Sequence, residues 1–528
     1  MSPSLGTFFT PTSVFFSLLA IVGLSQVFKI LCRRAHTMRR AGPPSSSWIF
    51  GAGRVLRAAA DSASLYEGWS RAHGSVYALP AAFGTHSIVL MDPKAIAHCS
   101  ARDTYGYFKS NLSKLAIQDM IGKGLLWADG GSHKRQRKTL TPAFSNITIR
   151  RLTPIFFDSA YKVKATWDGF IEAGTTGESV TDVQTWYLLP NCLIYMMNRV
   201  SLDSIGLAGF AHDFGTLRGE NPTVAAVFDA FGHIVPWLIK LPTHHERMVR
   251  TLNRSMGEIA DVMLERERRA EEKDPRKSVI GLLLKAEGNE EVMTQDEIMA
   301  QMKVMLLAGY ETTSISLTWA LIELSKNQQM QTKLREELAQ FGASDPTWDQ
   351  LANSLPYLDA IVHGTLRTHA PVGEISRVAM EDDVVPLSMP ALAAAGGATT
   401  DRISITRGTI ITVPIRAIHL SEDIWGPDAK MFKPERWLSG DEPAVARVRE
   451  LSGHRHLLTF FDSSRICIGK NFALAEIKVV LFVLVRSFVF EPRDGPETKI
   501  KTKVAIMSRP TIKGEEGAQF PLRVRRLA

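Results

Sequence analysis

An extended apolar segment lies close to the start of the chain. From Phe8 to Leu31 the residues are mostly Phe, Leu, Val and Ile, and a basic cluster begins at Arg33. A helix over this stretch would be about 36 Å long at about 1.5 Å per residue, which is enough to span a bilayer. We therefore predict one N-terminal transmembrane helix in residues 1–32, followed by a basic and Pro-rich hinge in residues 33–50.

The charges around this segment set its expected orientation. No Lys or Arg precedes Phe8, whereas Lys29 lies near its far end and several arginines follow. The positive-inside rule then places the rest of the chain in the cytosol. A cleaved signal peptide is the alternative, but such a peptide normally begins with basic residues and ends at a small-x-small site. The sequence favours an uncleaved anchor.

Beyond the hinge, the pattern predicts one large domain over residues 51–528. Short apolar runs bounded by turn residues indicate strands at residues 77–80, 87–91, 403–405 and 409–413. Helical periodicity dominates between Leu115 and Gln340, and no Gly/Ser-rich linker or repeat divides the chain. The expected fold class is mainly α with a small β-sheet.

Composition narrows the class of protein. The chain has 528 residues, of which 45% are hydrophobic and 22% charged, with a net charge of +8. No lysine-rich tail or basic–aromatic stripe is present, which argues against a nucleic-acid partner. The positive excess suits an anionic membrane surface or an acidic electron-donor protein. Four scattered cysteines are too few for a disulfide framework, so we expect the domain in a reducing compartment.

The longest predicted helix contains an unusual polar run. It begins at a capping box, Thr294 to Glu297, and continues to about Leu324. Inside it, Ala308-Gly309-Tyr-Glu311-Thr312-Thr combines a glycine, which costs about 1 kcal/mol in a helix, with two poor helix formers. The helical repeat places Ala308, Gly309 and Thr312 on one face, and turns Glu311 elsewhere, towards water. A Thr-rich helix kink is the alternative interpretation.

A lone cysteine near the C-terminus has a distinctive setting. Arg465 lies two residues before Cys467, Gly469 two after it and Phe460 seven before it, at the start of an amphipathic helix. A helix N-terminus favours an anionic sulfur. Gly469 allows the backbone to pass close to a flat macrocycle, and Arg465 can pair with a propionate. The spacing suits a thiolate bound axially to haem iron, whereas a buried structural cysteine is the alternative.

A third motif is basic. His133 and Arg137 are four residues apart and so share one helix face. Taken alone, this run could equally be a solvated basic surface.

Together, and in this order along the chain, the motifs resemble those of the cytochrome P450 superfamily, the haem-thiolate monooxygenases. The cysteine run is similar to F-x-x-G-x-R-x-C-x-G, and the helical run is similar to A-G-x-[DE]-T-[TS]. The resemblance covers about residues 42–515, and the stretch from Asp203 to Phe210 is similar to fungal microsomal members.

The resemblance implies the cytochrome P450 fold and a haem, iron protoporphyrin IX, with Cys467 as the axial iron ligand. Thr312 and Glu311 would deliver protons for oxygen activation. The residues that the resemblance places around the haem are His133, Arg137, Ala308, Gly309, Arg377, Phe460, Arg465 and Gly469. Segments 105–123, 304–308 and 372–376 would line the substrate pocket, and they are mostly apolar.

The implied activity is insertion of one oxygen atom from O2 into a lipophilic small molecule, terpenoid-like or similar, in secondary metabolism. Electrons would come from NADPH through cytochrome P450 reductase, with cytochrome b5 as a further candidate donor. The implied location is the endoplasmic reticulum membrane, single-pass, with the catalytic domain in the cytosol.

Two positions depart from the family pattern. The Glu-x-x-Arg motif reads Gly364-Thr-Leu-Arg367, although the later Pro-Glu-Arg motif, which ends at Arg436, is intact. Removing one partner of a buried ion network typically costs about 3–5 kcal/mol. Carbonyls and water could satisfy both arginines, or the protein could be weakly stable, or the change could be an error or inactivating. Ser463 replaces a glycine, which costs about 1–2 kcal/mol if that position needs a positive φ.

These departures motivate an alternative function, a haem-binding protein with weakened or lost catalysis. A haem-thiolate isomerase that uses hydroperoxides without a reductase is a third candidate. The intact Ala308 to Thr313 motif disfavours both, because neither needs a proton relay.

Overall fold

The computed structural model describes residues 41–59, 61–173, 178–182, 196–220, 293–392, 399–438, 446–504, 507–512 and 521–527, with a few residues between 247 and 262. The predicted anchor in residues 1–32 and the start of the hinge lie outside this part. Within it, we find no helix that combines the length and the apolar character needed to span a bilayer.

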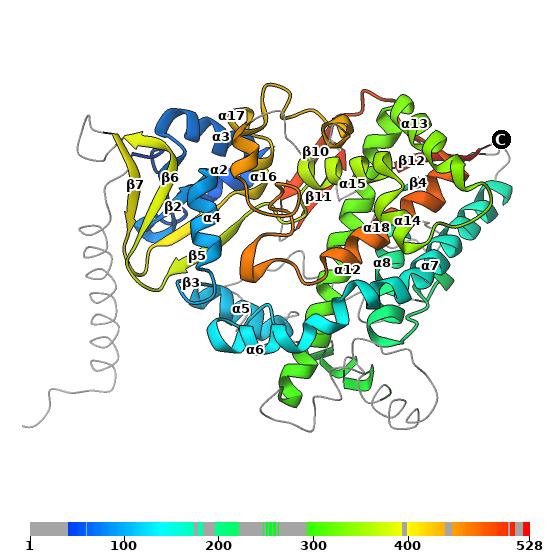
Figure 1. Ribbon diagram of the computed structural model, residues 1–528, viewed down its shortest axis with the longest axis horizontal. Coiled ribbons are helices and arrows are strands. Elements are labelled where there is room, and N and C mark those ends of the chain that lie inside the picture. The colour runs from blue at the N-terminus through cyan, green and yellow to red at the C-terminus, as the bar shows by residue number, and fades with distance from the viewer. Residues whose placement is uncertain are drawn as a thin grey trace, which may run out of the picture.

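Helices form one side of the molecule (Figure 1). The helices here are α7 (Asn146–Ala173), α8 (Met196–Phe210), α12 (Gln295–Lys326), α13 (Gln328–Leu338), α14 (Trp348–Asn353), α15 (Pro356–Thr368) and α18 (Lys470–Ser487). Helix α12 packs against α8, α15 and α18, and it is buried on most of its faces. The predicted capping box is confirmed, because the Thr294 hydroxyl accepts from Glu297 N and the Glu297 carboxylate accepts from Thr294 N.

The largest sheet lies on the other side (Figure 1). Among the described residues, a five-stranded sheet runs in the order β1 (Val76–Pro80), β2 (His86–Leu90), β8 (Ile410–Val413), β5 (Ile375–Ala379) and β3 (Tyr107–Phe108). Only the β2–β8 pair is parallel. The predicted strands at 403–405 and 409–413 both exist but do not pair with each other, because β7 (Thr399–Ile405) pairs with β6 (Asp383–Leu392).

Smaller elements complete the fold. The remaining sheets are β4 (Glu178–Asp182) with β12 (Pro521–Arg526) and β9 (Phe488–Pro492), and the hairpin β10 (Ile500–Val504) with β11 (Ser508–Ile512). The remaining helices are α2 (Gly53–Ala58), α3 (Ser62–His73), α4 (Pro93–Ala101), α5 (Asn111–Ile121), α6 (Gly130–Leu140), α16 (Ile415–His419) and α17 (Glu422–Trp425). One continuous apolar core joins both sides, from Ala52 to Val524. The predicted mainly α class with small sheets is confirmed.

Candidate active site

Two accessible side chains lie at the motifs of α12 and of the cysteine loop. Ala308 is exposed although Leu306 and Tyr310, its neighbours two residues away in α12, are buried. Cys467 is also exposed, yet burial raises the pKa of its thiol. A side chain that is surrounded by protein and still accessible lines an interior cavity rather than the outer surface. The predicted thiolate position, in a half-buried loop, and the polar run of the mostly buried α12 therefore each contain an accessible side chain.

The loop before α18 holds Cys467 in place. Its N–H donates to the Phe460 carbonyl at 2.7 Å. The Gly469 N–H and the charges of Arg137 and Lys470 oppose the effect of burial on the pKa of the thiol. Gly469 has a φ of −84°, and an added Cβ would lie 4.0 Å from the sulfur. Protein atoms alone therefore do not require glycine at this position.

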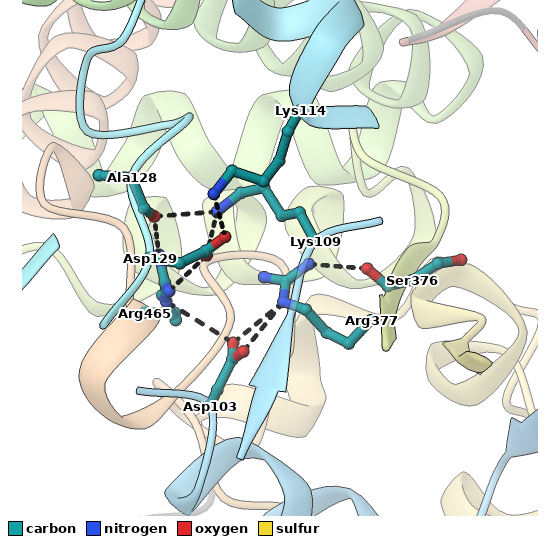
Figure 2. A network of polar contacts seen from close by, with 8 residues as sticks. All are labelled: Asp103, Lys109, Lys114, Ala128, Asp129, Ser376, Arg377 and Arg465. Atoms are coloured by element: carbon teal, nitrogen blue, oxygen red, sulfur yellow. Dashed lines mark hydrogen bonds and ion pairs between the residues drawn. The ribbon is translucent and has the colours of Figure 1, made fainter. Parts of the chain in front are cut away.

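A buried network of charges surrounds Arg377 and Arg465 (Figure 2). Arg377 Nε donates to Asp103 Oδ1 at 3.0 Å, and Arg465 Nη2 donates to Asp129 Oδ1 at 2.8 Å. Lys109 Nζ lies 3.2 Å from the same Asp129 oxygen. Both aspartates are almost fully buried. The structure thus brings the two predicted arginines together with two acidic residues that the sequence motifs did not identify.

The charges in this network do not balance. Figure 2 draws four basic side chains, with Lys114 as the fourth, against two carboxylates, which leaves a surplus of two positive charges. Burial, reinforced by the nearby Arg465, lowers the pKa of Lys109 to about 8. Since unbalanced buried charge is costly, the network fits a ligand that carries two carboxylates, as haem does. The donor set is therefore compatible with the cofactor that the motifs imply.

His133 and Arg137 project from α6 towards this region. Burial and the charge of Arg465 lower the pKa of His133 to about 3, so its ring is neutral near pH 7. Arg137 Nη1 donates to the carbonyl of Ile466 at 2.7 Å, directly before Cys467. The predicted sharing of one helix by these two residues is confirmed, and a solvated basic face is excluded for His133, which is 4% exposed.

The side chains of Glu311 and Thr312 leave α12 in different directions. Thr312 Oγ1 donates to the Ala308 carbonyl at 2.7 Å, which keeps it on the accessible face of the helix. Glu311 does not face water as expected, because its carboxylate Oε1 accepts from Arg509 Nε at 3.1 Å and Nη2 at 2.5 Å. One helical step of about 100° turns Glu311 towards β11. Motif reasoning missed Arg509 because it lies 198 residues away in the sequence.

Backbone carbonyls take the place of the missing glutamate. Arg367 is 1% exposed, and it donates to the carbonyls of His419 at 2.8 Å, Met431 at 2.6 Å and Ala429. Arg436 pairs with Asp428 and donates to the Trp425 carbonyl at 3.2 Å. Carbonyls thus satisfy the Nη atoms of Arg367, and Asp428 together with a carbonyl satisfies those of Arg436, whereas both Nε atoms have no partner among the described residues. This is the first of the three explanations in part, and these contacts do not test the other two.

Two neighbouring residues bear on these departures. Asp359, one helical turn before His363, does not replace the glutamate, since it pairs with Lys478 at 2.7 Å and with His363 at 3.3 Å. Ser463 has a φ of +55°, so the cost of about 1–2 kcal/mol predicted for a non-glycine residue applies.

Comparisons with known proteins agree with the motifs. The family model for cytochrome P450 matches residues 41–514. The cytochrome P450 monooxygenase claP of Ampulloclitocybe clavipes is 50% identical over 528 aligned positions, covering 96% of each chain. The monooxygenase claQ of the same fungus is 48% identical, covering 97% of this chain and 98% of its own. Cytochrome P450 monooxygenase 128 of Postia placenta is 32% identical, covering 92% of each chain.

Proposed function

Since this chain belongs to the cytochrome P450 family, we propose that it is an NADPH- and reductase-dependent monooxygenase that inserts one oxygen atom from O2 into a lipophilic small molecule. Family membership implies a haem-thiolate cofactor, iron protoporphyrin IX, and supports a monooxygenase role. The haem supplies the oxygen-activation chemistry when it is bound.

The observation that carries this proposal is the accessible thiol of Cys467 inside the protein. Cys467 would ligate the iron, and the hydrogen bond from its N–H to the Phe460 carbonyl holds the backbone that carries the sulfur. Arg377 and Arg465 would hold the two propionates with the surplus positive charge of their network. His133, Arg137, Ala308, Gly309, Phe460 and Gly469 would complete the contacts of the cofactor.

Thr312 would pass protons to the reacting oxygen. Its hydroxyl donates to Ala308 O, which leaves its lone pairs free to accept a proton. Glu311, the neighbouring acid, would supply that proton. Both residues lie on the helix that carries the accessible Ala308, which supports their assignment.

The proposed substrate is a terpenoid-like or similar secondary metabolite. Of the three segments that correspond to the family's pocket, 304–308 and 372–376 carry one ionisable side chain, Glu374, and it accepts a hydrogen bond from Tyr66. The third segment, 105–123, carries more charge, and its Lys109 and Lys114 pair with Asp129. Two largely apolar segments favour a lipophilic molecule.

We further propose attachment to the cytosolic face of the endoplasmic reticulum membrane through the apolar N-terminal segment. An exposed apolar group lies close to where the described chain begins, formed by Trp48, Ile49, Phe50 and Phe83. The Trp48 and Phe83 rings lie 5.9 Å apart. Trp and Phe at such a surface are typical of residues that insert into the bilayer interface. Cytochrome P450 reductase, with cytochrome b5 as a second candidate donor, would reach the chain on this membrane.

Product formation with and without the reductase tests the proposal. A monooxygenase needs NADPH, reductase and O2 together, whereas an isomerase would convert hydroperoxides without them. A protein that binds haem without turnover would form product under neither condition. The missing glutamate was one reason to consider a haem-binding protein without catalysis, and the carbonyl contacts of Arg367 weaken that reason.

A further inference from the structure

A chain of hydrogen bonds leads from α15 to the first residue of α18, three positions after Cys467. Lys470 Nζ lies 3.3 Å from His454 Nδ1, and His454 Nε2 lies 3.3 Å from His363 Nε2. His363 Nδ1 lies 2.8 Å from the carbonyl oxygen of Asp359. Side chains from α15, from the loop before the cysteine and from the start of α18 are therefore joined in one line.

The hydrogen bonds of this chain can run in one direction only. An ammonium group has no lone pair, so Lys470 Nζ donates and His454 Nδ1 accepts. Burial, together with the charge of Lys470, lowers the pKa of His454 to about 3, so its ring is neutral near pH 7 and carries its proton on Nε2. His454 Nε2 then donates to His363 Nε2, and His363 Nδ1 donates to the Asp359 carbonyl. The tautomers of both rings follow from the ammonium at one end of the chain.

The backbone around His454 has an unusual conformation. Arg455 and His456 have φ values of +53° and +61°, in the left-handed region that residues with a side chain rarely adopt. Gly453 has a φ of +123°, and an added Cβ there would lie 2.6 Å from the Leu457 carbonyl oxygen. A β-bridge between His454 and Leu457 closes the turn. Because such a backbone persists only where the surrounding structure maintains it, the imidazole of His454 is held by a defined turn.

The ammonium of Lys470 is close enough to Cys467 to act on its sulfur. The backbone N–H of Lys470 donates to the Cys467 carbonyl at 3.4 Å. Burial lowers the pKa of Lys470 and Cys467 opposes this change, while the charge of Lys470 opposes the rise that burial causes in the pKa of the Cys467 thiol. In the part of the chain that the structure describes, we find no carboxylate paired with Lys470, whose side-chain nitrogen contacts His454. Its positive charge is therefore directed at the sulfur.

We propose that His454 is a positioning residue that holds the Lys470 ammonium beside the sulfur of Cys467, where its charge raises the reduction potential of a haem iron bound there. His363 fixes the tautomer of His454. This inference rests on the proposed function. Uptake of one electron from the reductase makes the haem–thiolate unit more negative, and a nearby positive charge favours that state. The chain would therefore make electron transfer from the reductase more favourable.

Reductive titration of the purified full-length holoenzyme with dithionite and redox dyes measures this effect without reductase or substrate. Lys470→Gln should shift the equilibrium about tenfold towards the oxidised form, which corresponds to a potential about 59 mV lower for a one-electron couple. Lys470→Arg keeps the charge and should stay close to the wild-type potential. The matched control is Lys138→Gln, at an exposed position of α6, where water and salt screen the charge, and it should also stay close to wild type.

Variants of His454 test whether it positions the ammonium. His454→Phe keeps an aromatic ring but cannot accept from Lys470, so the potential should fall in the same direction as in Lys470→Gln. His454→Gln can accept through its amide oxygen and donate through its amide nitrogen, so it should keep the potential near that of wild type. The double variant His454→Phe with Lys470→Gln should have the potential of Lys470→Gln alone.

An unchanged potential in Lys470→Gln or in His454→Phe would overturn the inference, as would shifts that add in the double variant. Lys470 is half-buried, so its variants should fold even where His454→Phe does not, and an unchanged potential in Lys470→Gln is sufficient to overturn the inference. The spectrum of each reduced variant with carbon monoxide shows whether thiolate ligation is kept. Wild type without thiolate-bound haem would contradict the proposed function and this inference together, whereas thiolate-bound haem with unshifted potentials would contradict this inference alone.

Discussion

Replacing Gly364 with the glutamate that the family has at this position tests whether the buried arginines still need a carboxylate partner. An ideal Cβ at Gly364 would lie 3.1 Å from Phe432 Cε2 and 3.5 Å from Cζ. The Phe432 ring packs against the apolar core, so it must shift by a few tenths of an ångström for any side chain here. The Nη atoms of Arg367 already donate to three carbonyls. A new carboxylate would therefore meet both a steric obstacle and a guanidinium that is largely satisfied.

The favourable and unfavourable contributions of the new glutamate to the free energy of unfolding can be estimated. Relative to glycine, glutamate gains about 1 kcal/mol of helix propensity. Arg367 Nε and Arg436 Nε have no hydrogen-bond partner among the described residues, and one charge-assisted bond to either would add about 1.5–3 kcal/mol. Against this, overpacking costs about 1–3 kcal/mol, and burying a carboxylate costs several kcal/mol. We expect Gly364→Glu to destabilise the protein by about 1–3 kcal/mol.

Differential scanning calorimetry of the haem-loaded protein measures this change. An unfolding entropy of about 2.1 cal/mol/K per residue gives roughly 1 kcal/mol per degree for a chain of this size, so Tm should fall by about 1–3 °C. Gly364→Ala is the matched control, because it adds the Cβ and the propensity without the charge, and it should be close to neutral. Combining Gly364→Glu with Phe432→Leu should recover part of the loss. A Tm above wild type in Gly364→Glu with Phe432 unchanged would refute this reasoning.

Three other outcomes are expected. Thr312→Ala should keep haem and substrate binding but lower the product formed per NADPH, and unchanged coupling would show that protons arrive by another route. Deleting residues 1–32 should move the protein from membranes towards the soluble fraction, whereas full retention would assign the attachment to exposed apolar surface on the domain. Burial raises the pKa of Glu476 well above its usual value, so the folded protein binds this proton more tightly than the unfolded chain does, and the contribution of Glu476 to stability should fall as pH rises above about 4.3. Glu476→Gln should then gain stability over wild type between pH 5 and pH 8 in thermal unfolding, and an equal pH dependence in both proteins would contradict this.

Sequence patterns predicted the features that depend on neighbours in the chain. The capping box at Thr294 and the shared helix of His133 and Arg137 follow from spacings of three and four residues, which fix helical contacts directly. The strands at 403–405 and 409–413 were found for the same reason, from local alternation and turn residues.

Features that depend on distant parts of the chain were not predictable. Arg509 and Asp103 lie in no recognised motif, and only the fold brings them to Glu311 and Arg377. The pairing of β8 with β2 and β5 likewise reflects sheet topology rather than local pattern. The carbonyls that satisfy Arg367 leave no side-chain signature, so the sequence alone could only offer them as one explanation among three.

The absorption spectrum of the reduced protein with carbon monoxide tests the central assignment, thiolate ligation by Cys467, most directly. Wild type should show the red-shifted Soret band of a thiolate-bound haem, and Cys467→Ser should lose it. Cys99→Ser is the matched control, since Cys99 is a free, buried cysteine of α4 and belongs to a different element from Cys467, and it should keep the band. A normal red-shifted band in Cys467→Ser would contradict the account.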